Sequence, residues 1–88
     1  MKVGKHSIFK CVVKDVSEKS IFINKKILYK DIAVLGVGEV ISTISAEEGS
    51  VLFFNKNISD FINVGDILIE TCVVPFPGLM LNLVQNHV

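Results

Sequence analysis

Apolar and polar residues alternate over several short stretches of the chain, and this period of two predicts β-strands. The first stretch covers residues 7–16, in which alternate residues from Phe9 onward are apolar. Residues 20–29 predict a hairpin that turns at Asn24-Lys25, because asparagine tolerates left-handed backbone better than most residues. We expect both stretches to be strands with one face toward a core and one face toward water.

Further strands are predicted over residues 39–45, 51–54 and 66–74. The second of these is almost wholly apolar, which is typical of a strand buried on both faces. Before these strands, residues 30–38 are irregular, and their two glycines allow the chain to bend sharply. About six or seven short, mostly antiparallel strands in a single domain, residues 1–88, predict an all-β fold, either a small barrel or a sandwich.

A tight turn is predicted at residues 63–66, immediately before a strand rich in branched side chains. Gly65 can take the positive φ that such a turn often needs, and the Asp66 carboxylate can accept hydrogen bonds from nearby backbone amides. We therefore predict that Gly65 and Asp66 have a structural role, which supports a fold class and no activity.

The composition also favours strands. Ile and Val supply 24 of the 88 residues and Ala only two, and β-branched side chains suit a pleated sheet better than a helix. The apolar runs are too short, and too often interrupted, for a transmembrane helix. The basic N-terminus is not followed by the apolar region of a signal peptide. We expect a cytoplasmic or particle-associated protein without a membrane span.

Charge is unevenly distributed, although the formal net charge is zero. Residues 1–30 contain eight lysines against two acidic residues, whereas residues 31–88 contain one lysine against seven acidic residues. The sequence has no arginine. Such asymmetry indicates either a surface that faces a partner or a set of solvated strand faces and turns.

Lysines and aromatic residues are interleaved in the first third of the chain. The lysines that could form a face for nucleic acid or an acidic partner are Lys10, Lys14, Lys25, Lys26 and Lys30. The rings among them are Phe9, Phe22 and Tyr29. A basic sheet with stacking rings is how oligonucleotide-binding barrels hold single strands. The interpretation that we favour is that Phe9 and Phe22 belong to the core and that the lysines are their solvent-facing neighbours.

Residues that carry chemistry are sparse. His6 and His87 lie at opposite ends of the chain, and no cluster of Cys, His and Asp offers further ligands for a metal. We expect no catalytic residues, no metal, no cofactor and no small-molecule substrate. Cys11 and Cys72 both lie inside apolar runs, which favours buried thiols; the alternative is a disulfide between adjacent strands.

The last predicted segment, residues 72–88, is interrupted by Pro75 and Pro77, which are poorly suited to the middle of a sheet. It also holds a dense group of large apolar residues: Phe76, Leu79, Met80, Leu81, Leu83 and Val84. We expect this segment to be an arm that packs against another subunit or partner. The alternative is that Gly78 turns the segment back to close the barrel within one chain.

Two segments, Ala46-Glu-Glu-Gly-Ser-Val51 and Phe61-Ile-Asn-Val-Gly-Asp-Ile-Leu68, resemble half of a biotinyl/lipoyl-like domain. In that family a Gly-x-Val strand is followed by a Val-x-x-Gly-Asp turn at much the same distance. The family's modifiable lysine would follow in the next hairpin, where residues 70–75 contain none. The resemblance therefore does not imply a carrier role.

A second resemblance covers about half of the chain. The segment Val37-Gly-Glu-Val-Ile41, the Gly65-Asp66 turn with Thr71, and the segment Val74-Pro-Phe-Pro-Gly-Leu-Met80 follow in this order. This order looks like the N-terminal β-barrel of hexameric rotary or export ATPase subunits. The family's Leu-Gly-Arg appears here as Leu-Asn-Leu, and no nucleotide-binding core follows within the 88 residues. The resemblance implies a barrel and a tendency to form rings.

Together these observations favour a non-enzymatic structural or assembly subunit that oligomerises or docks in a larger complex. A high apolar fraction in a short chain leaves surface available for an interface, and a virion or a secretion-type particle fits best. The first alternative is a barrel that binds single-stranded nucleic acid. The second is an isolated barrel module that resembles the N-terminal domain of hexameric ATPases.

Overall fold

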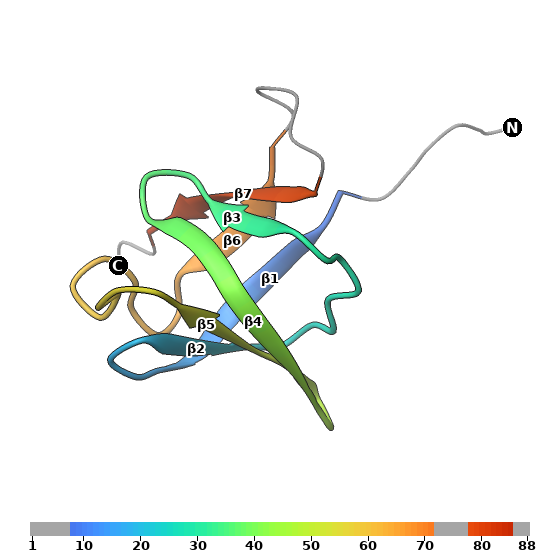
Figure 1. The fold of residues 1–88 in the computed structure, drawn as a ribbon, viewed down its shortest axis with the longest axis horizontal. Helices are drawn as coiled ribbons and strands as arrows, with labels where there is room; N and C mark the ends of the chain where they lie inside the picture. The colour runs from blue at the N-terminus through green and yellow to red at the C-terminus, as the bar shows by residue number, and fades with distance from the viewer. Residues whose placement is uncertain (1–7, 72–77, 86–88) are drawn as a thin grey trace, which may run out of the picture.

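The computed structural model describes residues 8–71 and 78–85, and these residues form seven strands and no helix (Figure 1). The strands are β1 (Lys10–Val16), β2 (Ser20–Ile23), β3 (Ile32–Val34), β4 (Gly38–Ala46), β5 (Gly49–Phe54), β6 (Ile67–Glu70) and β7 (Leu79–Val84). The all-β prediction is confirmed.

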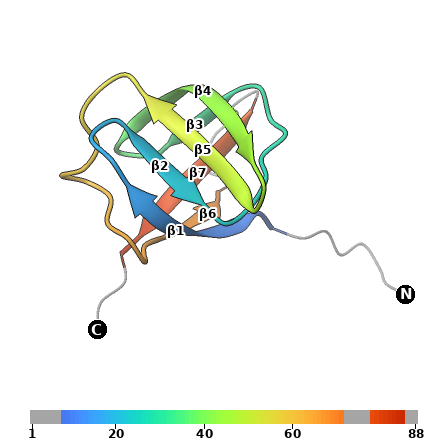
Figure 2. The ribbon, with the colours of Figure 1, turned by 90° about the horizontal axis from the view of Figure 1, so that it is seen from below.

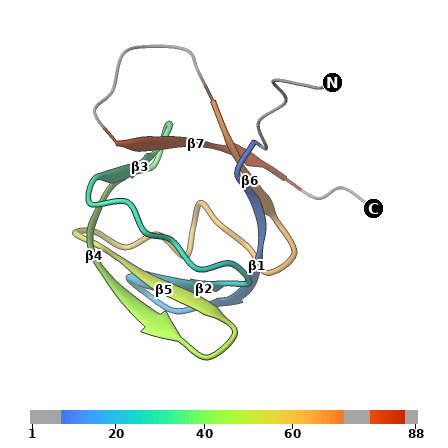
Figure 3. The same cartoon turned by 90° about the vertical axis from the view of Figure 1, so that its right-hand side faces the viewer.

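The seven strands close into a barrel in the order β1-β2-β5-β4-β3-β7-β6, and β6 pairs with β1 to complete the ring. Figure 3 looks into this ring, with β3 and β7 on one side of it and β2 and β5 on the other. The pair β3–β7 is parallel, and the other pairs are antiparallel. Closure leaves no free edge among the seven described strands. The structure is therefore a barrel and not a sandwich.

Alternate residues of the strands fill the barrel. From β2 the side chains of Ile21 and Ile23 point inward, and from β5 those of Leu52 and Phe54 do, each with no more than 2% of its surface exposed. Side chains between them in sequence lie on the outside, as the period of two requires. Figure 2 shows β1, β2, β5 and β4 side by side, so their outer faces form a continuous surface.

One end of the barrel is closed by the loop between β5 and β6. Ile58 and Ile62 of this loop are completely buried, and the Ile62 amide donates a hydrogen bond to the Ile58 carbonyl over 3.1 Å. This single turn directs both isoleucines into the core. Phe61 lies between them in the turn and stays 41% exposed.

The predicted turn before β6 is confirmed. Gly65 has a φ of 97°, and the Asp66 carboxylate accepts a hydrogen bond of 2.8 Å from the Asn63 amide. The turn is also attached to β1, because the Gly65 amide donates to the Val13 carbonyl and the Val13 amide donates to the Asp66 carbonyl, both over 2.8 Å. These two backbone hydrogen bonds therefore align β6 with β1 where the barrel closes.

The hairpin predicted at Asn24-Lys25 is wrong. After β2, residues 24–31 cross to β3 instead of returning beside β2, and no described residue other than glycine has a positive φ. Asn24 instead continues the pairing with β1: its amide donates to the Val12 carbonyl over 3.2 Å, and its side-chain oxygen accepts from the Val12 amide over 2.8 Å. β2 then pairs with β1 on one side and with β5 on the other.

Two smaller expectations also need correction. Within β5, Val51 and Phe53 are only half-buried, because this strand has one face on the outside of the barrel and is not buried on both. Residues 30–38, expected to be irregular, contain the fully buried β3. The expected sharp bend is present after β3, where Gly36 and Gly38 have φ values of 82° and 145°.

The C-terminal segment was expected to be an intermolecular arm, but residues 79–84 form β7, which closes the barrel between β3 and β6. Leu79 and Leu81 are 1% and 0% exposed, so the prediction that these two leucines contact a partner is wrong. For this segment the alternative holds, in which the segment closes the barrel within one chain. The Leu79 amide then donates to the Asp31 carbonyl over 2.7 Å.

The other predicted arm residues have different positions. Met80 and Leu83 are half-buried, and Leu83 packs against the barrel core. Val84 is 44% exposed. Phe76 lies outside the described residues. Of the described members of the set, Val84 thus offers the most free apolar surface.

Candidate functional site

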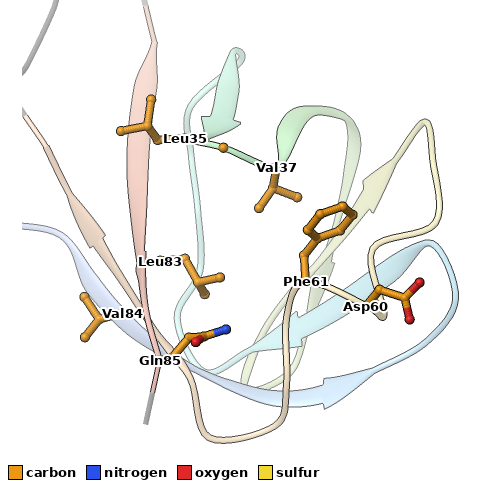
Figure 4. Close-up of a pocket in the computed structure, with 8 residues that line it drawn as sticks. Leu35, Val37, Asp60, Phe61, Leu83, Val84 and Gln85 are labelled. Atoms are coloured by element: carbon orange, nitrogen blue, oxygen red, sulfur yellow. The ribbon is translucent and has the colours of Figure 1, made fainter. Parts of the chain in front are cut away.

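A groove of about 620 Å³ opens at the end of the barrel where β3 and β7 finish. We call it the apolar groove, and its lining residues are Leu35, Gly36, Val37, Asp60, Phe61, Leu83, Val84 and Gln85. They come from three segments: the β3–β4 turn, the loop before β6 and the end of β7. Figure 4 shows Val37, Phe61 and Leu83 gathered round the same space.

Local structure explains why apolar side chains surround this groove. The Leu35 amide donates to the Leu81 carbonyl over 2.8 Å, which ties the start of the β3–β4 turn to β7. The positive φ of Gly36 then reverses the chain so that Val37 is buried while Leu35 stays 47% exposed. Opposite the turn, the burial of Ile58 and Ile62 leaves Phe61 on the surface.

Most side chains that line the groove are apolar, although polar atoms also supply a large share of its surface. Among its described lining residues, Asp60 is the charged one, and Gln85 adds an amide. The Lys56 ammonium lies 5.2 Å from the centre of the Phe61 ring, within the range of a cation–π contact. With one charged side chain among its described lining residues, the groove is better suited to an apolar side chain than to a strongly charged ligand.

At the opposite end of the barrel lies the crossing between β2 and β3, residues 24–31, which we call the basic loop (Figure 1). Ile27 holds it in place, since this residue is only 8% exposed and its amide donates to the buried Ser50 hydroxyl over 3.0 Å. The next residue, Leu28, is 92% exposed, and Tyr29 is 47% exposed. The fold therefore presents a leucine and a tyrosine to solvent on an anchored loop.

The predicted lysines are all exposed, and the structure brings some of them together. Lys10 starts β1 and Lys14 lies farther along the same strand, whereas Lys25, Lys26 and Lys30 belong to the basic loop. The Lys25 ammonium lies 5.7 Å from the centre of the Phe9 ring. The start of β1 and the basic loop thus form one basic region.

The rings that would stack on bases are less available than the lysines. Phe9 is partly buried against the barrel core and has Lys25 over its ring. Phe22 is half-buried on the outer face of β2, so the prediction that it belongs to the core is wrong. Tyr29 is the predicted ring with substantial exposure, and it lies in the basic loop. The structure therefore agrees only in part with a stacking platform.

The exposed apolar residues Leu28, Leu35 and Phe61 were not predicted as site residues. Apolar side chains look alike in sequence whether they are buried or exposed. Two local signals were nevertheless present. Leu28 stands among three lysines, and Leu35 precedes the glycine of a turn, where a chain usually lies at the surface.

Cys11 has a free thiol that is 2% exposed, and Cys72 lies outside the described residues. Burial raises the pKa of the Cys11 thiol from 9.0 to about 11, although the Lys25 charge and a backbone hydrogen bond with Leu68 act in the opposite direction. The group is therefore a neutral, buried side chain at neutral pH and lacks the thiolate that nucleophilic chemistry requires.

We expect Cys11 to react with a thiol reagent at pH 8 at least ~100-fold more slowly in the folded chain than in the unfolded chain, since its thiolate fraction is lower and its sulfur is covered. A Cys72→Ser background isolates this thiol. The part of the free energy of unfolding that depends on a neutral Cys11 thiol is fully present below pH 9.0, the ordinary pKa of the thiol. It decreases as the pH rises toward about 11, the pKa of the thiol in the folded chain. Equal rates in the two states at pH 8 would contradict burial of Cys11.

In the described part of the chain, no three or more His, Cys, Asp and Glu side chains gather in a way that could hold a metal ion. Within the same residues no helix is long and apolar enough to cross a membrane. Both histidines lie outside the described ranges.

Comparison with protein-family models, with curated proteins and with solved structures found no match.

Proposed function

We propose that this chain is a non-catalytic β-barrel that works by assembly, either with copies of itself or as a subunit of a larger particle of virion or secretion type. One observation carries the proposal: large apolar side chains remain on the surface after the barrel core is complete. The described exposed set is Ile8, Leu28, Tyr29, Leu35, Ile41, Ile44, Phe61, Val64 and Val84.

Single exposed apolar residues are normal on any protein surface, so their grouping is what matters. Leu35, Phe61 and Val84 each expose between 41% and 47% of their surface, and all three line the apolar groove. An exposed apolar patch with a polar rim is typical of a protein–protein interaction site.

Size-exclusion chromatography with light scattering tests this proposal. We expect an apparent mass above the 9.7 kDa of the single chain that rises with protein concentration, and no change when a single-stranded oligonucleotide is added. A mass of 9.7 kDa at every concentration would contradict self-assembly.

A second candidate function is single-strand nucleic-acid binding, supported by the basic region that contains Lys10, Lys25 and Lys26 with Tyr29 beside it. The lack of arginine and the covered ring of Phe9 make it the weaker candidate. Binding of an oligonucleotide that weakens steeply with salt would favour it, because phosphate contacts release counterions. The alternative of an ATPase-type barrel module is supported only by the order of its sequence motifs.

A further inference from the structure

We propose that the apolar groove of one chain binds the basic loop of a second copy, so that the chains associate head to tail. Leu28 would enter the groove, and Tyr29 would cover its edge. This inference rests on the proposed assembly function and names the two surfaces that meet.

The basic loop has the properties of an inserting element. Leu28 exposes 92% of its surface, the largest fraction among the exposed large apolar residues of the described ranges. The Leu28 side chain cannot turn inward, because the neighbouring Ile27 already occupies the core. The Ile27 amide also donates a hydrogen bond to the Ser50 hydroxyl, which fixes the backbone at this point. An ordered loop loses little conformational entropy when it binds, so an exposed leucine on it is well prepared for an interface.

The apolar groove has the complementary properties. Its volume of about 620 Å³ falls in the range of about 300–1,000 Å³ that is typical of binding pockets. Val37 and Leu83 form its apolar base, while Leu35 and Phe61 stand half-exposed at its rim. Burying a leucine side chain there would remove apolar surface from water, which favours association.

The charges of the two surfaces are complementary. The basic loop contains Lys25, Lys26 and Lys30 against Asp31, whereas Asp60 is the charged residue among the described groove lining. The Lys56 ammonium lies 5.2 Å from the centre of the Phe61 ring, so it offsets part of the Asp60 charge at the groove. A lysine beside Leu28 would pair with Asp60, and this contact would set the orientation more than the affinity.

The positions of the two surfaces exclude a contact within one chain. The basic loop precedes β3 and the β3–β4 turn follows it, so the loop and the groove lie at opposite ends of this strand. Figure 1 shows the two ends on opposite sides of the molecule. A contact between unlike surfaces of identical chains is heterologous and generates either a closed ring or an open filament.

Two variants with complementary defects test the inference. Leu28→Asp removes the inserting residue and leaves the groove intact, and Leu35→Asp places a charge at the groove and leaves the loop intact. Both residues are exposed, so folding should survive, which circular dichroism checks. We expect each variant alone to associate at least ~10-fold more weakly than the original chain. Mixed in equal amounts, they should form a dimer that does not grow further, because only one intact loop and one intact groove remain.

Ile44→Asp is the matched control, since Ile44 is 54% exposed on β4 and belongs to neither surface. We expect it to assemble like the original chain. If Ile44→Asp abolishes assembly while the other two variants assemble normally, the proposed function stands and the head-to-tail contact is wrong. A mixture of Leu28→Asp and Leu35→Asp that stays monomeric also overturns the contact. If the original chain never assembles, both self-assembly and this inference fail.

Discussion

Leu81→Ala is expected to destabilise the barrel by about 2–5 kcal/mol, whereas Val84→Ala is expected to cost less than about 1 kcal/mol. Both residues belong to β7, but Leu81 is completely buried and Val84 is 44% exposed. Leu81 pairs with Val34 of β3 and with Glu70 of β6, so truncating it leaves a cavity where the barrel closes. Urea unfolding followed by circular dichroism measures both variants.

Removal of all residues after Thr71 extends this prediction. The shortened chain would lose β7, which would open the barrel between β3 and β6 and expose two strand edges. We expect it to be unfolded. A shortened chain that folds but no longer assembles would instead support the intermolecular arm. Small, equal effects of Leu81→Ala and Val84→Ala would also contradict the structural role of β7.

Features that depend on neighbouring residues were predictable from the sequence. The strand near residues 10–16 follows from alternating side chains, and the turn at Gly65 follows from a glycine and an aspartate at suitable spacing. In both cases the physical cause is local: side chains alternate across a strand, and glycine accepts a positive φ.

Strand pairing was not predictable in the same way, because it depends on residues far apart in the sequence. A hairpin at Asn24 was a reasonable local prediction, but pairing of β2 with β5 joins residues about 30 positions apart and leaves no room for a returning strand. For the same reason, closure of the barrel by the segment that forms β7 was the alternative and not the favoured interpretation. Pro75 and Pro77 indicated that the sheet was interrupted, yet the sequence does not show that the chain rejoins it at Leu79.

The candidate site was predictable only in its charged part. Lysines such as Lys26 were expected on the surface because burying an unpaired charge is costly, and they are exposed. The exposure of Leu28 arises from the anchoring of Ile27 to Ser50, which lies 23 positions away. That contact is set by the tertiary fold, so the neighbouring lysines indicate a surface loop but do not show which of its apolar residues is exposed.

Gly49→Ala is expected to destabilise the barrel by at least about 3 kcal/mol, for a reason that differs from the turn at Gly65. Gly49 begins β5 and does not have a positive φ, so its backbone conformation is open to any residue. However, a Cβ atom at this position would overlap the carbonyl oxygen of Ile23, which belongs to β2. Because the obstacle is backbone, β2 and β5 would have to separate at a point where Ile23 pairs with Ser50.

Two control variants separate this effect from general sensitivity of the region to substitution. Glu48→Ala changes an exposed residue of the same β4–β5 turn and should alter stability by no more than about 0.5 kcal/mol. Gly36→Ala has no heavy atom within 4 Å of the added carbon, but it forces alanine to a φ of 82°, which should cost about 1–3 kcal/mol. The expected order of unfolding midpoints is therefore Glu48→Ala above Gly36→Ala above Gly49→Ala. If Gly49→Ala were as stable as Glu48→Ala, β2 and β5 would not approach each other as closely as the barrel requires.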